Sequence, residues 1–144
     1  MLYLGADHNG YFLKEEIKKF LQNQNIVFHD FGAVNFLKTD DYVDYAVKVG
    51  KVIKVNDTGL LICGSGHGMV IAANKLSGIR ATMPLSAASA RQARKEDFSN
   101  VLVLAAREMD GVRAKKLITA FLSVGYGRAA RYGRRLKKIK QLER

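Results

Sequence analysis

The sequence has only one cysteine, Cys63, and three histidines among its 144 residues. A single thiol cannot form an intramolecular disulfide, and it excludes a zinc site built from four cysteines. A free thiol fits a protein of a reducing compartment. His8, His29 and His67 are scattered along the chain, whereas a metal site needs three or four converging ligands. We therefore expect no metal ion.

Long apolar runs are also missing. No uninterrupted apolar run approaches the roughly 20 residues that a bilayer-spanning helix needs. The stretch from Met1 to His8 has no basic segment of the kind that opens a secretory signal peptide. We expect the protein to be soluble and cytoplasmic, with no membrane contact.

Acidic residues are few, because 13 Asp and Glu accompany 24 Lys and Arg. This surplus favours an anionic partner, which leaves nucleic acid, an acidic membrane surface and a phosphate ester open. Residues 128–144 hold eight of the cations and one acid, Glu143. Most of the surplus is therefore expected in a basic, helical C-terminal tail.

Segments with the pattern of strands alternate with segments that have the period of helices, and this order predicts a parallel sheet covered by helices. The expected strands are 2–4, 26–28, 59–63, 79–82 and 101–105. Apolar spacing predicts helices over 11–22, 42–55 and 112–124, and another that begins near residue 69. We expect a single domain, residues 1–144, with an α/β, doubly wound, Rossmann-like sheet of about five strands and helices on both faces.

Two segments follow expected strands at the edge where open α/β sheets bind ligands. The first is Gly5 to Asn9 and the second is Cys63 to Gly68. The glycines of the second segment allow a close backbone approach, so several N–H groups can surround an anion. A tight strand-to-helix connection with no ligand is the equally weighted alternative.

Both nucleotide-binding fingerprints are absent from this glycine turn. A P-loop ends in Gly-Lys-Ser/Thr, but the chain continues Gly68-Met69-Val70. The dinucleotide motif spaces its third glycine differently and expects an acid about 20 residues on, where residues 77–81 contain none. Nucleotide binding is therefore disfavoured.

Cys63 ends the third expected strand. A lone cysteine there is more often a core residue than a reactive group. Its place before a helix N-terminus favours a reactive role, because aligned N–H dipoles stabilise a thiolate that can act as a base. By itself, His8 next to Asp7 is most often a loop histidine with no role. For His67, an exposed turn residue is favoured over a ligand-facing group.

Six segments in this order and spacing are characteristic of a known family. They are GADH at 5–8, FLKEEI at 12–17, DYVDYA at 41–46, GLLICGSG at 59–66, IAANK at 71–75 and GIRA at 78–81. Together they resemble the ribose-5-phosphate isomerase B family, which includes the galactose-6-phosphate isomerase subunits. The resemblance runs from the first strand to about Ile139. It implies interconversion of an aldose phosphate and a ketose phosphate through a cis-enediol, without metal or organic cofactor.

The resemblance also implies roles for residues of the glycine turn. Cys63 would be the base that moves the proton, with Ser65 assisting. The backbone N–H groups of the turn would stabilise the enediolate oxygen. These groups belong to Gly64, Ser65, Gly66, His67 and Gly68.

Further residues would hold the substrate. By the resemblance, Asp7 and His8 contact the sugar. Arg107, Arg131 and Arg135 grip the substrate, chiefly its phosphate, because a guanidinium can donate two parallel hydrogen bonds. Arg131 and Arg135 lie four apart, so they share one face of a helix.

The chain departs from the family pattern at several positions. Many members carry a His-Asn pair that opens the furanose ring and helps to hold the enediolate, and Glu96 and Asp97 occupy the matching positions. Glu96 can still act as an acid and base if its pKa is raised, whereas an ionised Asp97 would repel the enediolate. Tyr132 stands where a histidine is frequent, and Val43 where a proline is frequent.

Three interpretations of function follow. The favoured one is isomerisation of ribose 5-phosphate by a homodimer, or a tetramer, with its site at the subunit interface. The second is the same chemistry on a six-carbon substrate such as allose or galactose 6-phosphate. The third is a non-catalytic sugar-phosphate or nucleic-acid binding protein, although the tail contains one aromatic residue, Tyr132, and no nucleic-acid-binding motif.

Overall fold

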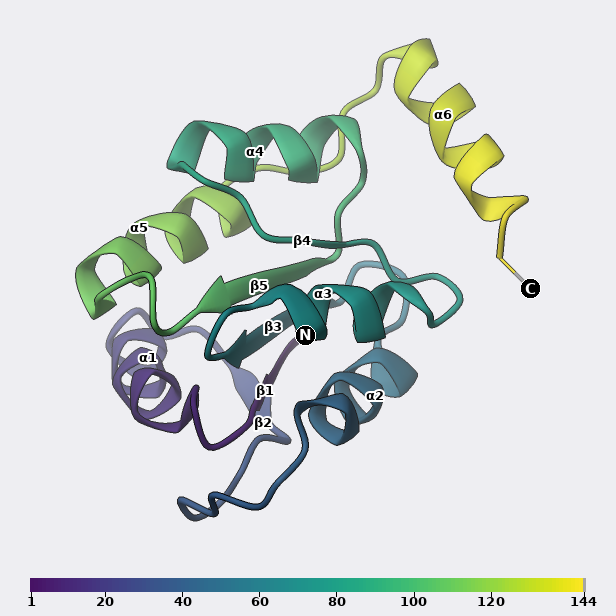
Figure 1. Cartoon of the computed structure of the whole chain (residues 1–144). Coiled ribbons are helices and arrows are strands. Elements are labelled where there is room, and N and C mark those ends of the chain that lie inside the picture. Colours follow the sequence, from purple (N-terminus) through teal and green to yellow (C-terminus); the bar gives the residue numbers. More distant parts are fainter. Residues whose placement is uncertain (144) are drawn as a thin grey trace.

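The computed structural model describes residues 1–143, so Arg144, the last residue of the predicted domain and basic tail, lies outside the described residues. The chain forms a five-stranded parallel sheet in the order β2-β1-β3-β5-β4 (Figure 1). The strands are β1 (Leu2–Ala6), β2 (Phe28–Asp30), β3 (Thr58–Cys63), β4 (Ala81–Thr82) and β5 (Val101–Ala105). The helices are α1 (Tyr11–Asn23), α2 (Tyr42–Val52), α3 (His67–Asn74), α4 (Ala87–Glu96), α5 (Gly111–Leu122) and α6 (Ala130–Lys140). The predicted doubly wound α/β fold is confirmed.

Helices cover both faces of the sheet because its central strands are apolar on both sides. In β3, Leu60 and Ile62 point to the core formed with α1, α4 and α5. Leu61 and Cys63 alternate with them and point to the core formed with α2 and α3 (Figure 1). Fully burying each leucine or isoleucine stabilises the fold by about 1.5–3 kcal/mol.

Element ends differ from the prediction where backbone bonds compete with the pattern. β2 begins at Phe28 and not at Ile26, because the Ile26 N–H still donates to the Leu21 carbonyl at the end of α1. α2 ends at Val52 and not at Val55, since Ile53 is extended and the Lys54 N–H donates to Asp57. β4 is shorter than the predicted 79–82 for a similar reason.

In that third case the Arg80 N–H donates to the Asn100 side chain at 2.8 Å. The Arg80 N–H is therefore held by a side chain and not by a strand neighbour, although the Arg80 carbonyl still accepts the backbone N–H groups of Asn100 and Val101. Only Ala81 and Thr82 pair with β5.

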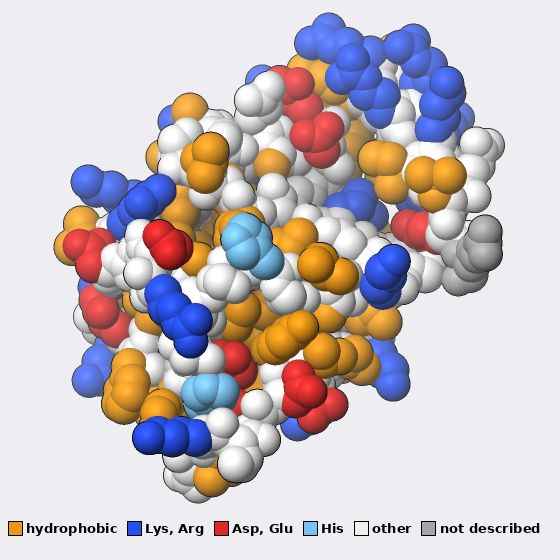
Figure 2. Space-filling model, in the orientation of Figure 1, with side chains coloured by type: hydrophobic (Ala, Val, Ile, Leu, Met, Phe, Trp, Pro, Cys, Tyr) orange, Lys and Arg blue, Asp and Glu red, His pale blue; other side chains and the backbone are white. Residues whose placement is uncertain are grey.

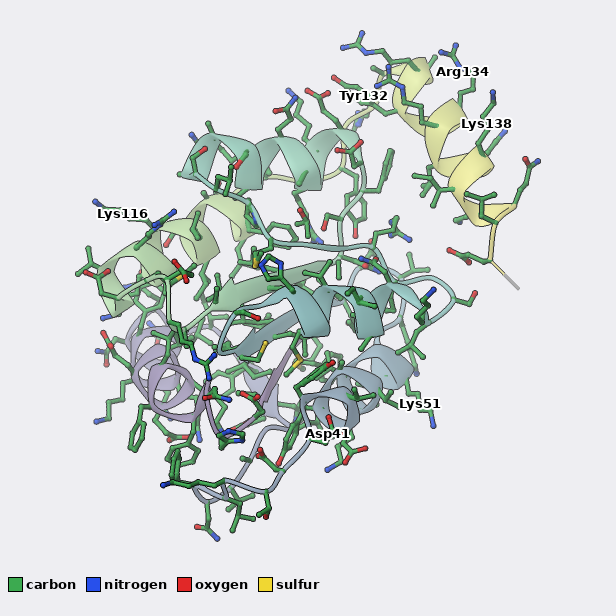
Figure 3. The ribbon with its side chains drawn as sticks, viewed as in Figure 1. Asp41, Lys51, Lys116, Tyr132, Arg134 and Lys138 are labelled. Carbon is green, nitrogen blue, oxygen red and sulfur yellow. The ribbon has the colours of Figure 1, made fainter. Side chains whose placement is uncertain are left out.

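The C-terminal helix α6 projects from the rest of the molecule (Figure 1). Tyr132 is buried and anchors it, because the ring packs on Gly127, whose N–H donates to the Lys95 carbonyl of α4 at 2.7 Å. Arg134 and Lys138 point outward (Figure 3). Lys and Arg side chains gather over α6 on the face shown in Figure 2. A cleft of about 740 Å³ lies between α6 and the loop after α3.

Candidate active site

The glycine turn connects β3 to α3 at the carboxyl edge of the sheet. Gly66 caps α3 with φ +80°, a left-handed conformation that glycine adopts without strain. A side chain at Gly66 would also collide with the Met83 sulfur. The Gly66 N–H donates to the Cys63 sulfur at 3.3 Å, so the turn directs a backbone donor at the thiol.

Burial raises the pKa of the Cys63 thiol, and the nearby Asp7 carboxylate raises it too. The backbone N–H groups of Gly66 and Met69 and the Arg107 guanidinium lower this pKa without reversing the shift. The sequence predicted the effect of the helix N-terminus correctly in direction. Burial outweighs it, so the resting group is a thiol at neutral pH.

The loop after β1 brings Asp7 against the same edge. Asp7 is 4% exposed, and its carboxylate accepts the Gly10 N–H at 3.0 Å. Gly10 lies so close to the Ile62 carbonyl that a side chain there would collide with it. This close approach of the start of α1 to β3 holds the loop that carries Asp7 near Cys63, where the Asp7 charge acts on the thiol.

His8 is held by Asp40, a residue that the sequence analysis did not select. The imidazole Nδ1 lies 2.6 Å from Asp40 Oδ1, which also accepts the His8 backbone N–H at 3.1 Å. The Tyr45 hydroxyl donates to Asp40 Oδ2 at 3.0 Å. Burial alone would raise the pKa of Asp40. The hydrogen bonds from His8 and Tyr45 lower this pKa by more than burial raises it, so Asp40 stays a carboxylate. Burial and the same carboxylate raise the pKa of Tyr45 to about 12.

Arg107 reaches this edge from the end of β5. Its backbone N–H donates to the Gly64 carbonyl at 3.0 Å, and its guanidinium packs against the Gly64 Cα. The guanidinium also donates to Asn9 Oδ1 at 3.1 Å. Asn9, which the sequence analysis placed in the β1 loop without a role, therefore links Arg107 to His8.

The rest of the turn is open to an incoming molecule. Ser65 and His67 are exposed, and Gly68 lies under the ring of Tyr42, which leaves no space for a Cβ. Tyr42 was part of a recognised motif but was not selected as a site residue. The structure thus gathers the first set of predicted site residues around one opening. They are Asp7, His8, Cys63, Gly64, Ser65, Gly66, His67, Gly68 and Arg107.

The second set of predicted site residues lies elsewhere in the chain. Glu96 ends α4, and Asp97 follows it and lines the cleft beside α6. Both precede β5, so they lie at the amino edge of the sheet, while Cys63 pairs with Ala105 at the carboxyl edge. Within residues 1–143 they do not reach the glycine turn.

Arg131 and Arg135 belong to α6, and the Arg131 guanidinium packs on the Tyr132 ring, 4.7 Å from its centroid. It also donates to the Tyr132 hydroxyl at 3.0 Å. Both arginines are exposed on the projecting helix. The chain by itself does not bring them to Cys63.

Over residues 1–143, no group of three His, Cys, Asp or Glu side chains is arranged to hold a metal ion. In the same part of the chain, no helix has the length and apolar character needed to cross a membrane.

Comparisons with known proteins identify the family of the chain. Residues 2–139 match the family model described as Ribose/Galactose Isomerase. The ribose-5-phosphate isomerase B of Escherichia coli is 36% identical over 141 residues, which cover 96% of this chain and 93% of the relative. The probable ribose-5-phosphate isomerase B of Mycoplasma genitalium is 35% identical, with coverage of 99% and 95%.

Solved structures are similar over nearly the whole chain. A ribose 5-phosphate isomerase from Thermotoga maritima superimposes with a TM-score of 0.92 at 38% identity, covering 98% of this chain and 97% of that one. The Mycoplasma genitalium enzyme with bound ribulose-5-phosphate superimposes with a TM-score of 0.91 at 35% identity, covering 97% and 93%. The predicted resemblance is confirmed: the chain belongs to the ribose/galactose isomerase family, and it is an enzyme of the aldose–ketose isomerase class.

Proposed function

We propose that the protein interconverts ribose 5-phosphate and ribulose 5-phosphate, with Cys63 as the proton-transferring base. The observation that carries this proposal is the Cys63 sulfur at the end of β3, with a backbone N–H of the glycine turn directed at it. Ribulose-5-phosphate is bound in the structure of a relative that covers 97% of this chain.

The proposed reaction moves hydrogen within the substrate and needs no external oxidant. The Cys63 thiolate takes the C2 proton of the open-chain aldose, and the C1 carbonyl electrons move to its oxygen. Backbone N–H groups of residues 64–68 stabilise that oxygen as negative charge develops on it. The C2 hydroxyl proton then moves to the C1 oxygen as the C2 carbonyl forms, and the Cys63 thiol delivers a proton to C1, which yields the ketose and restores the thiolate.

Polar and charged side chains around the turn bind and orient the substrate in this proposal. Arg107 is placed to bind an anionic or hydroxyl oxygen of the substrate above Gly64. Asp7 and His8 are placed to contact the sugar from the β1 loop. Ser65, exposed on the turn, assists the proton transfer in this proposal.

We propose that a second copy of the chain completes the site. Arg131 and Arg135 stand on a projecting helix, and Glu96 and Asp97 lie at the opposite edge of the sheet. A homodimer, or a tetramer built from dimers, would let these residues of one subunit reach the glycine turn of the other. Each active site would then combine two subunits.

A six-carbon sugar phosphate is the second candidate substrate. The matching family model covers ribose and galactose isomerases, so the family does not by itself select five carbons. Glu96 and Asp97 replace the usual pair at the positions that contact the sugar ring. Allose 6-phosphate and galactose 6-phosphate are the compounds to compare. Family membership favours either enzyme over a nucleic-acid binding protein, and the free Cys63 fits the proposed cytoplasmic location.

Turnover of ribose 5-phosphate, allose 6-phosphate and galactose 6-phosphate by the purified protein, with a chelator present, tests the proposal. Cys63→Ala serves as the blank. Ribose 5-phosphate turnover that survives chelation and vanishes in the blank is the expected result. Preference for a hexose phosphate would identify a six-carbon sugar phosphate as the substrate. No turnover of any of the three compounds would contradict the proposal.

A further inference from the structure

An unbroken chain of hydrogen bonds crosses the mouth of the site from β5 to α2. The Arg107 guanidinium donates to Asn9 Oδ1 at 3.1 Å, and Asn9 Nδ2 lies 2.8 Å from His8 Nε2. His8 Nδ1 lies 2.6 Å from Asp40 Oδ1, and Tyr45 donates to Asp40 Oδ2 at 3.0 Å. The Asp40 side chain is 9% exposed and that of His8 is 24% exposed, so the Asp40 end is largely shielded from water, whereas the bond between Arg107 and Asn9 is exposed.

The donors and acceptors at the two ends of this chain fix every proton between them. A guanidinium can only donate, so the Asn9 atom facing Arg107 must be the amide oxygen. The Asn9 amide nitrogen, which is only a donor, therefore faces His8 Nε2. Nε2 must accept, which means that it carries a lone pair and not a proton.

The imidazole proton must then sit on Nδ1, where the Asp40 carboxylate accepts it. The low pKa of Asp40 and the high pKa of Tyr45 are consistent with this order, because the first is an acceptor and the second a donor at neutral pH. The Phe36 ring also meets the imidazole edge-on, with 6.3 Å between centroids.

We propose that Asp40 is a positioning residue that holds His8 as a neutral imidazole with its proton on Nδ1 and, through Asn9, sets the direction of the Arg107 guanidinium. Nε2 is thereby kept as a hydrogen-bond acceptor at the mouth of the site. A sugar hydroxyl that displaces the Asn9 amide then donates a hydrogen bond to His8 Nε2. The part of this inference that concerns substrate rests on the proposed function, whereas the tautomer of His8 does not.

Nitrogen-15 NMR of histidine-labelled protein without substrate, at about pH 8, where an ordinary imidazole is neutral, reports the tautomer directly. His29→Gln and His67→Gln variants assign the His8 signals among the three histidines. The expected His8 spectrum has a protonated Nδ1 and an unprotonated Nε2. A protonated Nε2 in the unmodified protein would overturn the proposal, whether or not the protein proves to be an isomerase.

Substitutions at residue 40 provide the second readout. Asp40→Asn keeps an oxygen that can accept from Nδ1, so the His8 tautomer should persist. Asp40→Ala should lose it and lower kcat/KM for the sugar phosphate about tenfold, the effect expected for one hydrogen bond to a charged group. Glu16→Gln removes an exposed carboxylate of α1 that pairs with Lys115, outside this chain of hydrogen bonds, and should change neither readout.

The two assays separate the possible failures. An unchanged His8 spectrum together with unchanged kinetics in Asp40→Ala would overturn the positioning role. The predicted tautomer in a protein that isomerises no sugar phosphate would refute the proposed function and leave the His8 assignment intact. If Asp40→Ala does not fold, the unmodified protein and Asp40→Asn still decide the tautomer. The proposal stands if the Nδ1–H tautomer is found in both.

Discussion

The Gly66 backbone N–H donates a hydrogen bond to the Cys63 sulfur at 3.3 Å, and it can do so because Gly66 has φ +80°. The same residue caps α3 and packs against Met83 without space for a Cβ. The direction of this donor therefore depends on a backbone conformation that side chains rarely adopt. This relationship connects a local turn to the chemistry proposed for the thiol.

Gly66→Ala should disrupt both the fold and the reaction. A methyl group would strain the left-handed backbone and press on the Met83 sulfur, which should lower the free energy of unfolding by about 1–3 kcal/mol. Denaturant unfolding and kcat/KM measure the two effects. Gly125→Ala is the matched control, because a Cβ there meets nothing within 4 Å. Wild-type stability in Gly66→Ala would refute the strain argument.

The rate should depend on pH through the Cys63 thiol. Burial raises its pKa, and a base must be unprotonated, so kcat/KM should keep rising as the pH passes the ordinary thiol value of about 8.5. Thiolate absorbance in the ultraviolet gives the same pKa without substrate. Asp7→Asn should move that titration to lower pH, because the Asp7 charge raises the Cys63 pKa. A rate that levels off at neutral pH would argue against Cys63 as the base.

A site shared between subunits predicts recovery of activity on mixing. Cys63→Ala protein and an Arg131→Ala, Arg135→Ala double variant should each be weak, the first in kcat and the second through a raised KM for the phosphate ester. Mixed dimers would hold one intact site, so random exchange should restore about a quarter of the unmodified activity. Mixing with no gain, in samples shown by mass to contain hybrid dimers, would place each site within one chain.

Asp97→Asn should increase the rate. An ionised carboxylate near the enediolate opposes the developing negative charge, whereas an amide can donate to it. We expect kcat to rise about tenfold, which corresponds to a transition state stabilised by about 1.4 kcal/mol, the free energy of one pKa unit. Steady-state kinetics on ribose 5-phosphate measure this, with the exposed Asp44→Asn as a control for general charge effects. A fall in kcat would indicate that Asp97 has a role of its own.

Acid should weaken the loop that carries Asp40. Lys14, 1% exposed, donates to Asp30 Oδ2 at 2.8 Å and to the Ala33 carbonyl at 2.7 Å. Burial alone would raise the pKa of Asp30. The bonds from Lys14, Lys18 and the Gly32 N–H have the larger, opposite effect, so the pKa lies below its ordinary value. The stability that this pair contributes is therefore complete above about pH 3.9, the unfolded value, and is lost as pH falls through the lower folded value.

Asp30→Asn tests this ion pair at neutral pH. It should cost about 3–5 kcal/mol, because the buried Lys14 ammonium loses its nearer carboxylate and keeps only Glu15, at 3.2 Å. The exposed pair of Glu16 and Lys115 is the control, and Glu16→Gln should cost less than about 1 kcal/mol. Thermal or denaturant unfolding compares the two variants, and equal losses would refute the assigned difference in burial.

The sheet could be predicted because its central strands are continuous apolar runs, as in residues 59–63 and 101–105. The carboxyl ends of β1 and β3 then placed Asp7 and Cys63 at one edge. The ends of α2 and β2 could not be predicted, since each depends on a local hydrogen bond that the apolar pattern does not mark. The Lys54 N–H donates to Asp57, and the Ile26 N–H donates to the Leu21 carbonyl.

Asp40 was missed for a related physical reason. It lies in the loop between β2 and α2, whose course is set by the buried Lys14 bonding Asp30 and Ala33. No local pattern marks a carboxylate that meets a histidine 32 residues away. Asn9 was visible in its segment, but its link to Arg107 appears only once β1 and β5 are placed beside β3.

Isomerisation of ribose 5-phosphate in heavy water, followed by NMR of the product, tests the central claim most directly. In proton transfer through a cis-enediol, the proton held by Cys63 exchanges with solvent before it is delivered to C1. We therefore expect solvent deuterium at C1 of ribulose 5-phosphate, and no labelled product with Cys63→Ala. Turnover without deuterium incorporation, or labelling by Cys63→Ala at the unmodified rate, would contradict the account.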